Sequence, residues 1–152
     1  MGTIYLVYGS EPYLITNYIK ELKEKYKDSD IISFDMNEIN IKEAVDEMFT
    51  GSLFTETKLI ICDNCNFLTG AKLDIPHDVE YLLKSLDNRV DNTLVLIVQN
   101  DSLDKRKKIV KELEKKANIK FFSKLKEFEL ENFIEKYIKD SGYKIDNSSI
   151  KL

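Results

Sequence analysis

The run TLVLIV, residues 93–98, points most directly to the architecture of this chain. All six residues are uncharged, and each is either β-branched or leucine. A strand with one solvent-exposed face alternates polar and apolar residues, whereas a strand buried on both faces is apolar throughout. The run therefore predicts a strand inside a mostly parallel sheet that has helices on both sides.

Further apolar runs and stretches with helical spacing lie on either side of this strand in the sequence. Strands are predicted at residues 3–9, 31–34, 58–62 and 119–122. Helices are predicted, from apolar side chains that recur every three or four positions, at residues 11–26, 39–49, 75–88 and 103–117. Strands and helices that alternate in this way predict an α/β three-layer sandwich with a mostly parallel five-stranded sheet.

The composition fits one compact domain with a short addition. The chain has 152 residues, of which 33% are charged, and a net charge of −4. A domain of this size can fold without a disulfide or a metal ion, and its acidic balance gives no overall attraction to nucleic acid. No apolar run approaches the ~20 residues that span a bilayer, and the N-terminus lacks the pattern of a secretory signal. We therefore expect a cytoplasmic protein without a membrane partner.

The last part of the chain has a different pattern. Residues 126–142 form a strongly amphipathic helical stretch that ends in glycine. Asp146 or Ser148 then looks like the N-cap of another helix, yet few residues follow. We expect an α/β domain at residues 1–125. Residues 126–152 are expected to be the first helix and the start of a helical lid domain, in a chain cut from a longer protein.

The first strand–helix loop, YGSEPYLI at residues 8–15, has the position of a nucleotide site but not its chemistry. A phosphate-binding loop needs a second glycine and a following lysine, and both are missing. Pro12 has no N–H to donate, and Glu11 would repel phosphate. Gly9 is expected to permit a tight turn, and Ser10 to cap the next helix. The loop therefore predicts no nucleotide cofactor.

The other chemically active residues form no recognisable catalytic set. Asp63 follows a strand and could hold Mg²⁺, but without a phosphate loop a role as a loop cap is favoured. His77 is expected in an exposed first turn of a helix. Cys62 and Cys65 form a C-x-x-C, and a structural role is favoured over a redox pair or a zinc site, which needs four ligands. We expect no catalytic residue, no metal and no enzyme activity.

Two large apolar residues, Leu53 and Phe54, stand in the turn-like stretch TGSLFTETKLII at residues 50–61. Gly51 is expected to end the preceding helix, and the pair does not fit the apolar stripe of that helix. The pair could fold back as a plug over the sheet edge. It could also project outward as an anchor for a pocket on a partner. The residues themselves leave both interpretations open.

Several segments, taken in order, resemble one protein family. They are YLVYGSEPYLI, SLFTETKLIICDNCNFL, TLVLIV, SLDKRKKIVKEL and FSKLKEFELENFIEKYIKDSGYKID. Together they resemble the bacterial delta subunit of the DNA polymerase III clamp loader, over essentially the whole chain. This family is related to the AAA+ ATPases and lacks a working P-loop. The resemblance therefore implies a sheet similar to that of P-loop NTPases, without a functional P-loop.

The resemblance also implies a function. Members of the family bind the ring-shaped sliding clamp, the beta subunit, and help to open it for loading onto DNA. A Leu-Phe pair of the family maps onto Leu53 and Phe54, and Ser52 matches the polar residue that often precedes it. ATP hydrolysis is expected in neighbouring subunits of the holoenzyme. The resemblance also implies a collar domain that joins the other loader subunits, which is expected to lie outside this sequence, and an indirect contact with DNA.

A locally basic stretch, residues 105–116, leaves further functions open. Lys105, Arg106 and Lys108 could contact DNA or another loader subunit. A solvated outer helix face is favoured, because acidic residues are interleaved and no aromatic residue is placed for base stacking. The alternatives to a clamp-loader subunit are a degenerate nucleotide-binding α/β enzyme and a DNA-binding domain that uses this helix.

Overall fold

The computed structural model describes residues 3–50, 57–87 and 91–123. In chain order its elements are β1 (Ile4–Gly9), α1 (Pro12–Lys25), β2 (Asp30–Asp35), α2 (Ile41–Met48), β3 (Lys58–Asp63), the 3-10 helix η1 (Asn66–Leu68), α3 (Val79–Ser85), β4 (Thr93–Val98), α4 (Lys108–Lys116) and β5 (Asn118–Phe122). Each strand and helix predicted before residue 123 is present, with the largest shifts at the starts of α3 and α4.

The strands form one five-stranded sheet in the order β2-β3-β4-β1-β5. Every pair of neighbouring strands is parallel. β4 lies between β3 and β1, and all six of its residues are buried. The prediction of a parallel sheet in which residues 93–98 are an inner strand is therefore confirmed.

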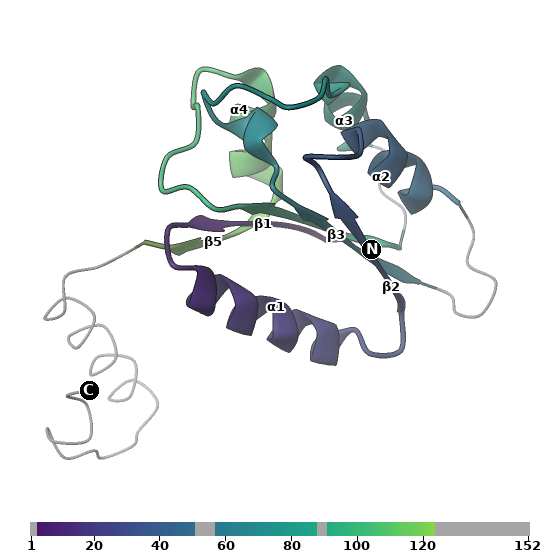
Figure 1. Cartoon of the computed structure of the whole chain (residues 1–152). Helices are drawn as coiled ribbons and strands as arrows, with labels where there is room; N and C mark the ends of the chain where they lie inside the picture. Colours follow the sequence, from purple (N-terminus) through teal and green to yellow (C-terminus); the bar gives the residue numbers. More distant parts are fainter. Residues whose placement is uncertain (1–2, 51–56, 88–90, 124–152) are drawn as a thin grey trace, which may run out of the picture.

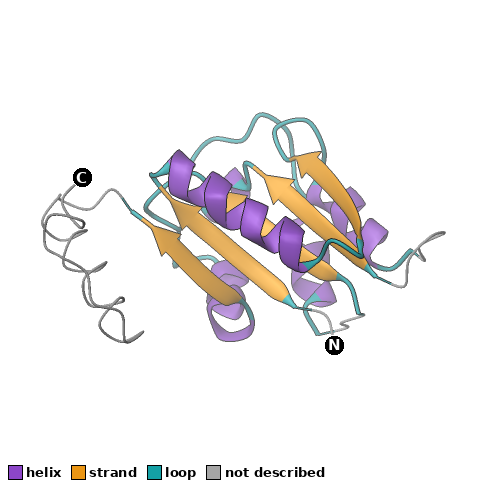
Figure 2. Cartoon of the chain, turned by 90° about the horizontal axis from the view of Figure 1, so that it is seen from below, coloured by secondary structure: helices purple, strands orange, loops and turns teal. Residues whose placement is uncertain are grey.

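Helices cover the two faces of the sheet unequally. α1 runs alone across one face, and α2, α3 and α4 lie together on the other (Figure 1). Figure 2, seen from below, shows α1 in front of the sheet and running roughly along its strands. Alternate residues of a strand point to opposite faces, so β4 gives Leu96 to the core shared with α2–α4 and Val95 to the core shared with α1. The three layers thus follow from strands that are apolar on both faces.

Gly9 allows the edge strand β5 to approach β1 closely. Its φ is +147°, a conformation that residues with a Cβ rarely adopt. A Cβ at this position would lie 2.0 Å from the carbonyl oxygen of Phe122. Glycine is therefore required at position 9 for the close packing of β5 against β1. The sequence had predicted only that Gly9 permits a tight turn.

Two helices begin later than the periodicity predicted. α3 begins at Val79 and α4 at Lys108, each about a turn inside the predicted range. Before α4, Asp104 accepts hydrogen bonds from the Arg106 N–H through its side chain and from the Lys107 N–H through its carbonyl, both at 3.1 Å. Such local bonds of aspartate compete with the helix and delay its start.

The expected cap of α1 by Ser10 is wrong. The N-cap position belongs to Glu11, and the Ser10 hydroxyl donates a hydrogen bond to Asp101 Oδ2 at 2.9 Å. Asp101 follows β4, and the loops after β1 and β4 are neighbours because these strands pair. The Ser10 hydroxyl therefore has a tertiary partner, Asp101, where a backbone N–H of α1 was expected.

Two further expectations fall on residues that the structure does not describe. They are the helix predicted over residues 126–142 and the domain boundary after residue 125. In the ranges that are described, no helix is long and apolar enough to cross a membrane.

Candidate partner-binding site at the α2–β3 connector

The predicted anchor residues Ser52, Leu53 and Phe54 lie outside the described residues. The chain is described on both sides of them, up to Thr50 and again from Thr57. Residues 49–57, here called the connector, join α2 to β3. The candidate site is therefore built from the two ends of the connector.

α2 leads into the connector and is fixed by its apolar face. Its start is capped by Asn40, whose side chain accepts a hydrogen bond from the Lys42 N–H at 3.0 Å. The residues of α2 buried in the core are Ile41, Ala44, Val45 and Met48. The next residue, Phe49, keeps 45% of its surface exposed. The helix thus ends in the core, and the chain turns toward solvent at the first residue of the connector.

The carboxyl end of α2 is bound by side chains from two other parts of the chain. Lys58 Nζ donates a hydrogen bond to the Glu47 carbonyl at 3.2 Å and lies 2.8 Å from Glu47 Oε1. Asn92 Nδ2 donates a hydrogen bond to the Met48 carbonyl at 2.5 Å. The last carbonyls of a helix have no partner within the helix, so these bonds satisfy groups that would otherwise need water.

The other end of the connector is bound to β2 and to the start of β4. The Thr57 hydroxyl lies 2.6 Å from the Ser29 hydroxyl, and the Thr57 carbonyl accepts a hydrogen bond from the Asp30 N–H at 3.1 Å. The Lys58 N–H donates to Asn92 Oδ1 at 2.7 Å. Both ends of the connector are therefore held by hydrogen bonds to residues distant in the sequence.

Two partly exposed aromatic rings lie near the α2 end of the connector. Phe49 is 45% exposed and Tyr81, on α3, is 38% exposed. The Tyr81 hydroxyl donates a hydrogen bond to the Asp46 carboxylate, and the Thr50 hydroxyl donates to the Asp46 carbonyl at 2.9 Å. This part of the surface therefore offers apolar area at the α2 end of the connector.

Lys58 and Asn92 were missed by sequence reasoning as parts of this site. The one available signal was a lysine at the start of an otherwise apolar run, KLIIC at residues 58–62. Nothing in the sequence around Asn92 indicates the backbone groups that its side chain contacts. These are the Met48 carbonyl and the Lys58 N–H, which are 44 and 34 residues away.

The loop between β1 and α1 does not present a free set of amides to a phosphate. The Glu11 N–H donates to the Phe122 carbonyl at 3.2 Å, and Pro12 is among the first residues of α1. The Ser10 side chain is directed to Asp101. The amide at the centre of the loop therefore binds β5, and its neighbour Pro12 has no N–H to offer.

Asp63 ends β3 directly opposite Asp35, which ends β2. Burial, followed by the charge of Asp35, raises the pKa of Asp63. Asp35 instead accepts hydrogen bonds from Asn64 and from the Asn37 N–H, and these lower its pKa. Among the described residues, no group of three potential metal ligands occurs. The loop cap here is Asp35, whereas the sequence interpretation had given that role to Asp63.

His77 is not an exposed residue in a helix turn, contrary to the prediction. It is half-buried before α3, with its ring 4.9 Å from the ring of Phe67. Its Nδ1 accepts a hydrogen bond from the Ile41 N–H at 3.0 Å, and its Nε2 lies 2.8 Å from the Met36 carbonyl. Burial lowers the pKa of this imidazole. His77 therefore joins the start of α2 to the loop before it, as a structural residue.

Cys62 and Cys65 are buried and are not joined by a disulfide. Cys65 Sγ donates a hydrogen bond to the Cys62 carbonyl at 3.3 Å. Burial raises the pKa of both thiols, which disfavours the thiolate form that redox chemistry and zinc binding use. Both belong to the core shared with α2–α4, which agrees with the structural interpretation.

The predicted basic residues lie at the start of α4. Lys105, Arg106 and Lys108 are exposed, and the Arg106 guanidinium pairs with Asp104 at 2.9 Å. Further along α4, Lys116 is held by Asp87 and Glu112. Arg106 and Lys116 are therefore paired with carboxylates of the same chain.

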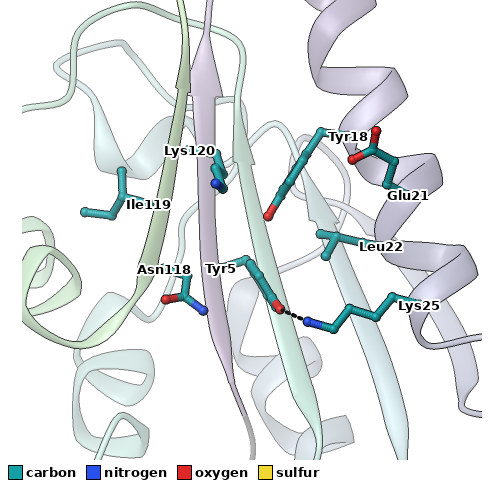
Figure 3. Close-up of a pocket in the computed structure, with 8 residues that line it drawn as sticks. All are labelled: Tyr5, Tyr18, Glu21, Leu22, Lys25, Asn118, Ile119 and Lys120. Atoms are coloured by element: carbon teal, nitrogen blue, oxygen red, sulfur yellow. Dashed lines mark hydrogen bonds between the residues drawn. The ribbon is translucent and has the colours of Figure 1, made fainter. Parts of the chain in front are cut away.

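Two open cavities lie away from the connector. One, of about 480 Å³, lies between α1 and the edge strand β5, where Lys25 contacts the Tyr5 hydroxyl at 3.4 Å (Figure 3). The other, of about 350 Å³, lies between η1, α3 and α4 and is lined mainly by apolar side chains, with Lys108 at its border.

Comparison with known proteins decides the family. A family model described as DNA polymerase III, delta subunit, matches residues 5–123. The chain belongs to the DNA polymerase III delta subunit family. DNA polymerase III subunit delta of Bacillus subtilis (strain 168) is 31% identical over 122 residues, which are 75% of this chain and 35% of the relative.

Solved structures agree with this assignment. The Bacillus subtilis DNA clamp loader delta protein (YqeN) has a TM-score of 0.85 and 27% identity, over 99% of this chain and 47% of that chain. The ORC2 protein of Aeropyrum pernix, described in ADPNP-ADP complexes, shares the fold alone, with a TM-score of 0.51 and 12% identity. The parallel sheet is thus AAA+-like. This delta-family chain spans about half the length of the solved relative and about a third of the curated one.

Proposed function

We propose that this chain is the clamp-binding part of a clamp-loader delta subunit. In this proposal Leu53 and Phe54, with Ser52 before them, insert into a pocket of the sliding clamp and help to open the ring. The observation that carries it is the match of the delta-subunit model over residues 5–123, a range that includes the whole connector. The similarity to a protein described as a DNA clamp loader delta protein supports the same role.

Burial of the Leu53 and Phe54 side chains in a pocket would contribute enough free energy to anchor the contact with the clamp. Burial of two large apolar side chains contributes about 1.5–3 kcal/mol each before the costs of association. The exposed surface of Phe49 and Tyr81 adds apolar area at the same end of the connector. Because β3 and β4 behind the connector are almost completely buried, the domain can transmit force to the clamp as a rigid body.

The proposed role needs no catalysis by this chain. Hydrolysis of ATP takes place in neighbouring loader subunits, and this chain contributes binding energy. Two features of the β1–α1 loop support this view, namely the bond between the Glu11 N–H and Phe122 and the position of Pro12. Residues 126–152 begin a helical domain in this proposal, and the parts that join other subunits lie in the remainder of the longer relatives.

The test is a comparison of clamp binding by the wild type and by the double variant Leu53→Ala, Phe54→Ala. We expect the double variant to lose at least about 100-fold in affinity for the sliding clamp, because both side chains anchor the contact. Its melting temperature should change little. The measurement is isothermal titration calorimetry, together with thermal unfolding followed by circular dichroism.

A matched control is Tyr13→Ala, which removes an aromatic side chain that is 72% exposed and lies near the start of α1. Helix α1 lies on the other face of the sheet from α2, which leads into the connector. This variant should bind the clamp as the wild type does. A double variant that loses several degrees of melting temperature would show that the pair is part of the core, and the proposal would then be rejected.

A further inference from the structure

The larger of the two open cavities, here called the α1–β5 cavity, lies between α1 and the edge strand β5 and has a volume of about 480 Å³. Small-molecule sites in proteins have volumes of about 300–1,000 Å³, so this cavity is large enough to hold a ligand. Its lining includes two lysines, Lys25 and Lys120, two tyrosines, Tyr5 and Tyr18, and the carboxylate of Glu21. Figure 3 shows Lys25 extending from α1 and Lys120 from β5, with the two tyrosines between them.

The two lysines of the α1–β5 cavity are held by aromatic side chains. Lys25 Nζ donates a hydrogen bond to the Tyr5 hydroxyl at 3.4 Å and lies 5.5 Å from the centre of the Tyr26 ring. Lys120 Nζ lies 5.8 Å from the centre of the Tyr18 ring. Among the described residues, neither ammonium group forms an ion pair with a carboxylate. Contact with an aromatic ring positions a cation but does not cancel its charge.

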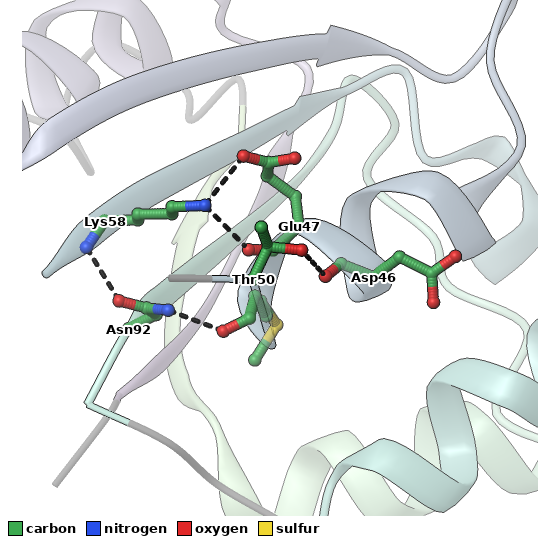
Figure 4. A network of polar contacts seen from close by, with 6 residues as sticks. Asp46, Glu47, Thr50, Lys58 and Asn92 are labelled. Atoms are coloured by element: carbon green, nitrogen blue, oxygen red, sulfur yellow. Dashed lines mark hydrogen bonds and ion pairs between the residues drawn. The ribbon is translucent and has the colours of Figure 1, made fainter. Parts of the chain in front are cut away.

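Several other lysines of the domain have their charge matched within the chain. Lys58 pairs with the Glu47 carboxylate at 2.8 Å (Figure 4). Lys116 is held by Asp87 and Glu112. A single lysine without an ion pair is ordinary on a protein surface. Here two such lysines, from two different elements, line the same cavity, so the cavity presents positive charge to a ligand.

The Tyr18 hydroxyl adds a neutral donor to the α1–β5 cavity. In Figure 3 it points into the space between α1 and the strands, and it has no hydrogen-bond partner among the described residues. The Tyr18 ring packs against Phe122, at 5.7 Å between centroids, which fixes the position of the hydroxyl. Glu21 also lines the cavity, but two lysines against one glutamate leave the lining with a positive charge.

We propose that the α1–β5 cavity binds a phosphate group, held by the ammonium groups of Lys25 and Lys120 and by the Tyr18 hydroxyl. A phosphate group carries up to two negative charges and several acceptor oxygens, so it can accept bonds from donors on separate elements. A carboxylate has one charge and two oxygens, and it matches this set of donors less well. The site contains no residue of the connector, so the proposal is independent of the clamp contact.

The test is a titration of the isotope-labelled 152-residue chain with inorganic phosphate, followed by NMR. We expect a dissociation constant of about 1–5 mM, with the shifted resonances grouped on α1 and β5. Lys25→Met and Lys120→Met should each weaken binding at least about five-fold, because each removes one of the two cations. Tyr18→Phe keeps the ring and removes the hydroxyl, and it should weaken binding about three-fold.

Lys20→Met is the matched control for the loss of one positive charge. Lys20 is an exposed lysine on α1 that does not line the cavity. Its loss should leave phosphate binding within about two-fold of the wild type, because exposed charges at a distance are screened. Glu21→Gln should strengthen phosphate binding, because it removes the negative charge from the lining. Acetate at the same ionic strength controls for a general attraction of anions.

A second titration, with a short single-stranded oligonucleotide, identifies the source of the phosphate group. Tighter binding of the oligonucleotide that is lost in Lys25→Met and Lys120→Met supports the proposal, with a nucleic-acid backbone as the ligand. Binding of inorganic phosphate alone that is lost in the same variants supports the proposal, with free phosphate or a small phosphoester as the ligand.

Three results would overturn the proposal. They are the absence of binding by either ligand, equal binding of acetate and phosphate, and a loss of affinity in Lys20→Met as large as that in Lys25→Met. None of them bears on the clamp contact, which is tested separately by the double variant Leu53→Ala, Phe54→Ala.

Discussion

At the scale of single residues, the polar side chains that organise this domain bind partners far away in the chain. His77 accepts a hydrogen bond from the Ile41 N–H, 36 residues away, and its other nitrogen lies beside the Met36 carbonyl. An imidazole can accept at Nδ1 and donate at Nε2 only when it is neutral. The half-buried position of the ring and this pair of bonds both favour the neutral form.

The first prediction concerns pH. Burial lowers the pKa of His77 in the folded chain below the value of about 6.5 expected after unfolding. The unfolded state therefore binds a proton first, so the contribution of His77 to stability is complete above that value and decreases as the pH falls below it. Urea unfolding between about pH 7 and pH 5 should show this loss.

His77→Gln is the control, because His77 is the one histidine of the sequence. The difference in unfolding free energy between wild type and variant should shrink as the pH falls across this window. A difference that stays constant, or an imidazole that titrates above its ordinary pKa in NMR, would contradict the assignment.

At the scale of elements, the approach of β5 to β1 depends on one backbone position. Gly9 pairs with Phe122 in the parallel ladder, and the Phe122 carbonyl occupies the space that a Cβ would need. The ring of Tyr8 also stacks on Phe121 of β5, at 4.6 Å between centroids. The edge strand is thus held by backbone bonds and by contacts that require its close approach.

The second prediction is that Gly9→Ala destabilises the domain by more than about 2 kcal/mol, through strain at positive φ and the clash with β5. Gly70→Ala is the matched control, because a Cβ at Gly70 meets no atom within 4 Å. The control should change stability by less than about 1 kcal/mol. Equal denaturation midpoints for the two variants would show that the close approach is unimportant.

At the scale of the whole molecule, the domain combines an AAA+-like sheet with a β1–α1 loop whose central amide is already bonded. The Glu11 N–H bonds to Phe122 of β5, so a phosphate would have to compete with a strand contact. The charge of Glu11 and the missing N–H of Pro12 add to this barrier. The loop therefore lacks the free central amide with which a phosphate-binding loop holds its ligand.

The third prediction follows from this loop. Calorimetric titration with Mg-ATP should detect no binding tighter than about 1 mM. An active AAA+ ATPase, measured under the same conditions, provides the positive control. Micromolar binding would favour the alternative of a nucleotide-binding α/β enzyme, and the view that ATP acts only through neighbouring subunits would have to be abandoned.

The sequence by itself determined the elements and the class of the fold. Apolar runs such as residues 93–98 predicted strands buried on both faces, and helical spacing predicted the helices between them. These signals are local, because burial on one or two faces imposes its period within a window of some ten residues. The five resembling segments also predicted the family, which the comparisons confirmed.

Only the tertiary structure decided which distant residues meet. It placed β4 between β3 and β1, directed Ser10 to Asp101, and brought Asn92 to both ends of the connector. Such bonds join residues that are tens of positions apart, and their geometry depends on how the layers pack. A local sequence pattern does not depend on that packing. The polar residues at the two ends of the connector could therefore not be found from periodicity or composition.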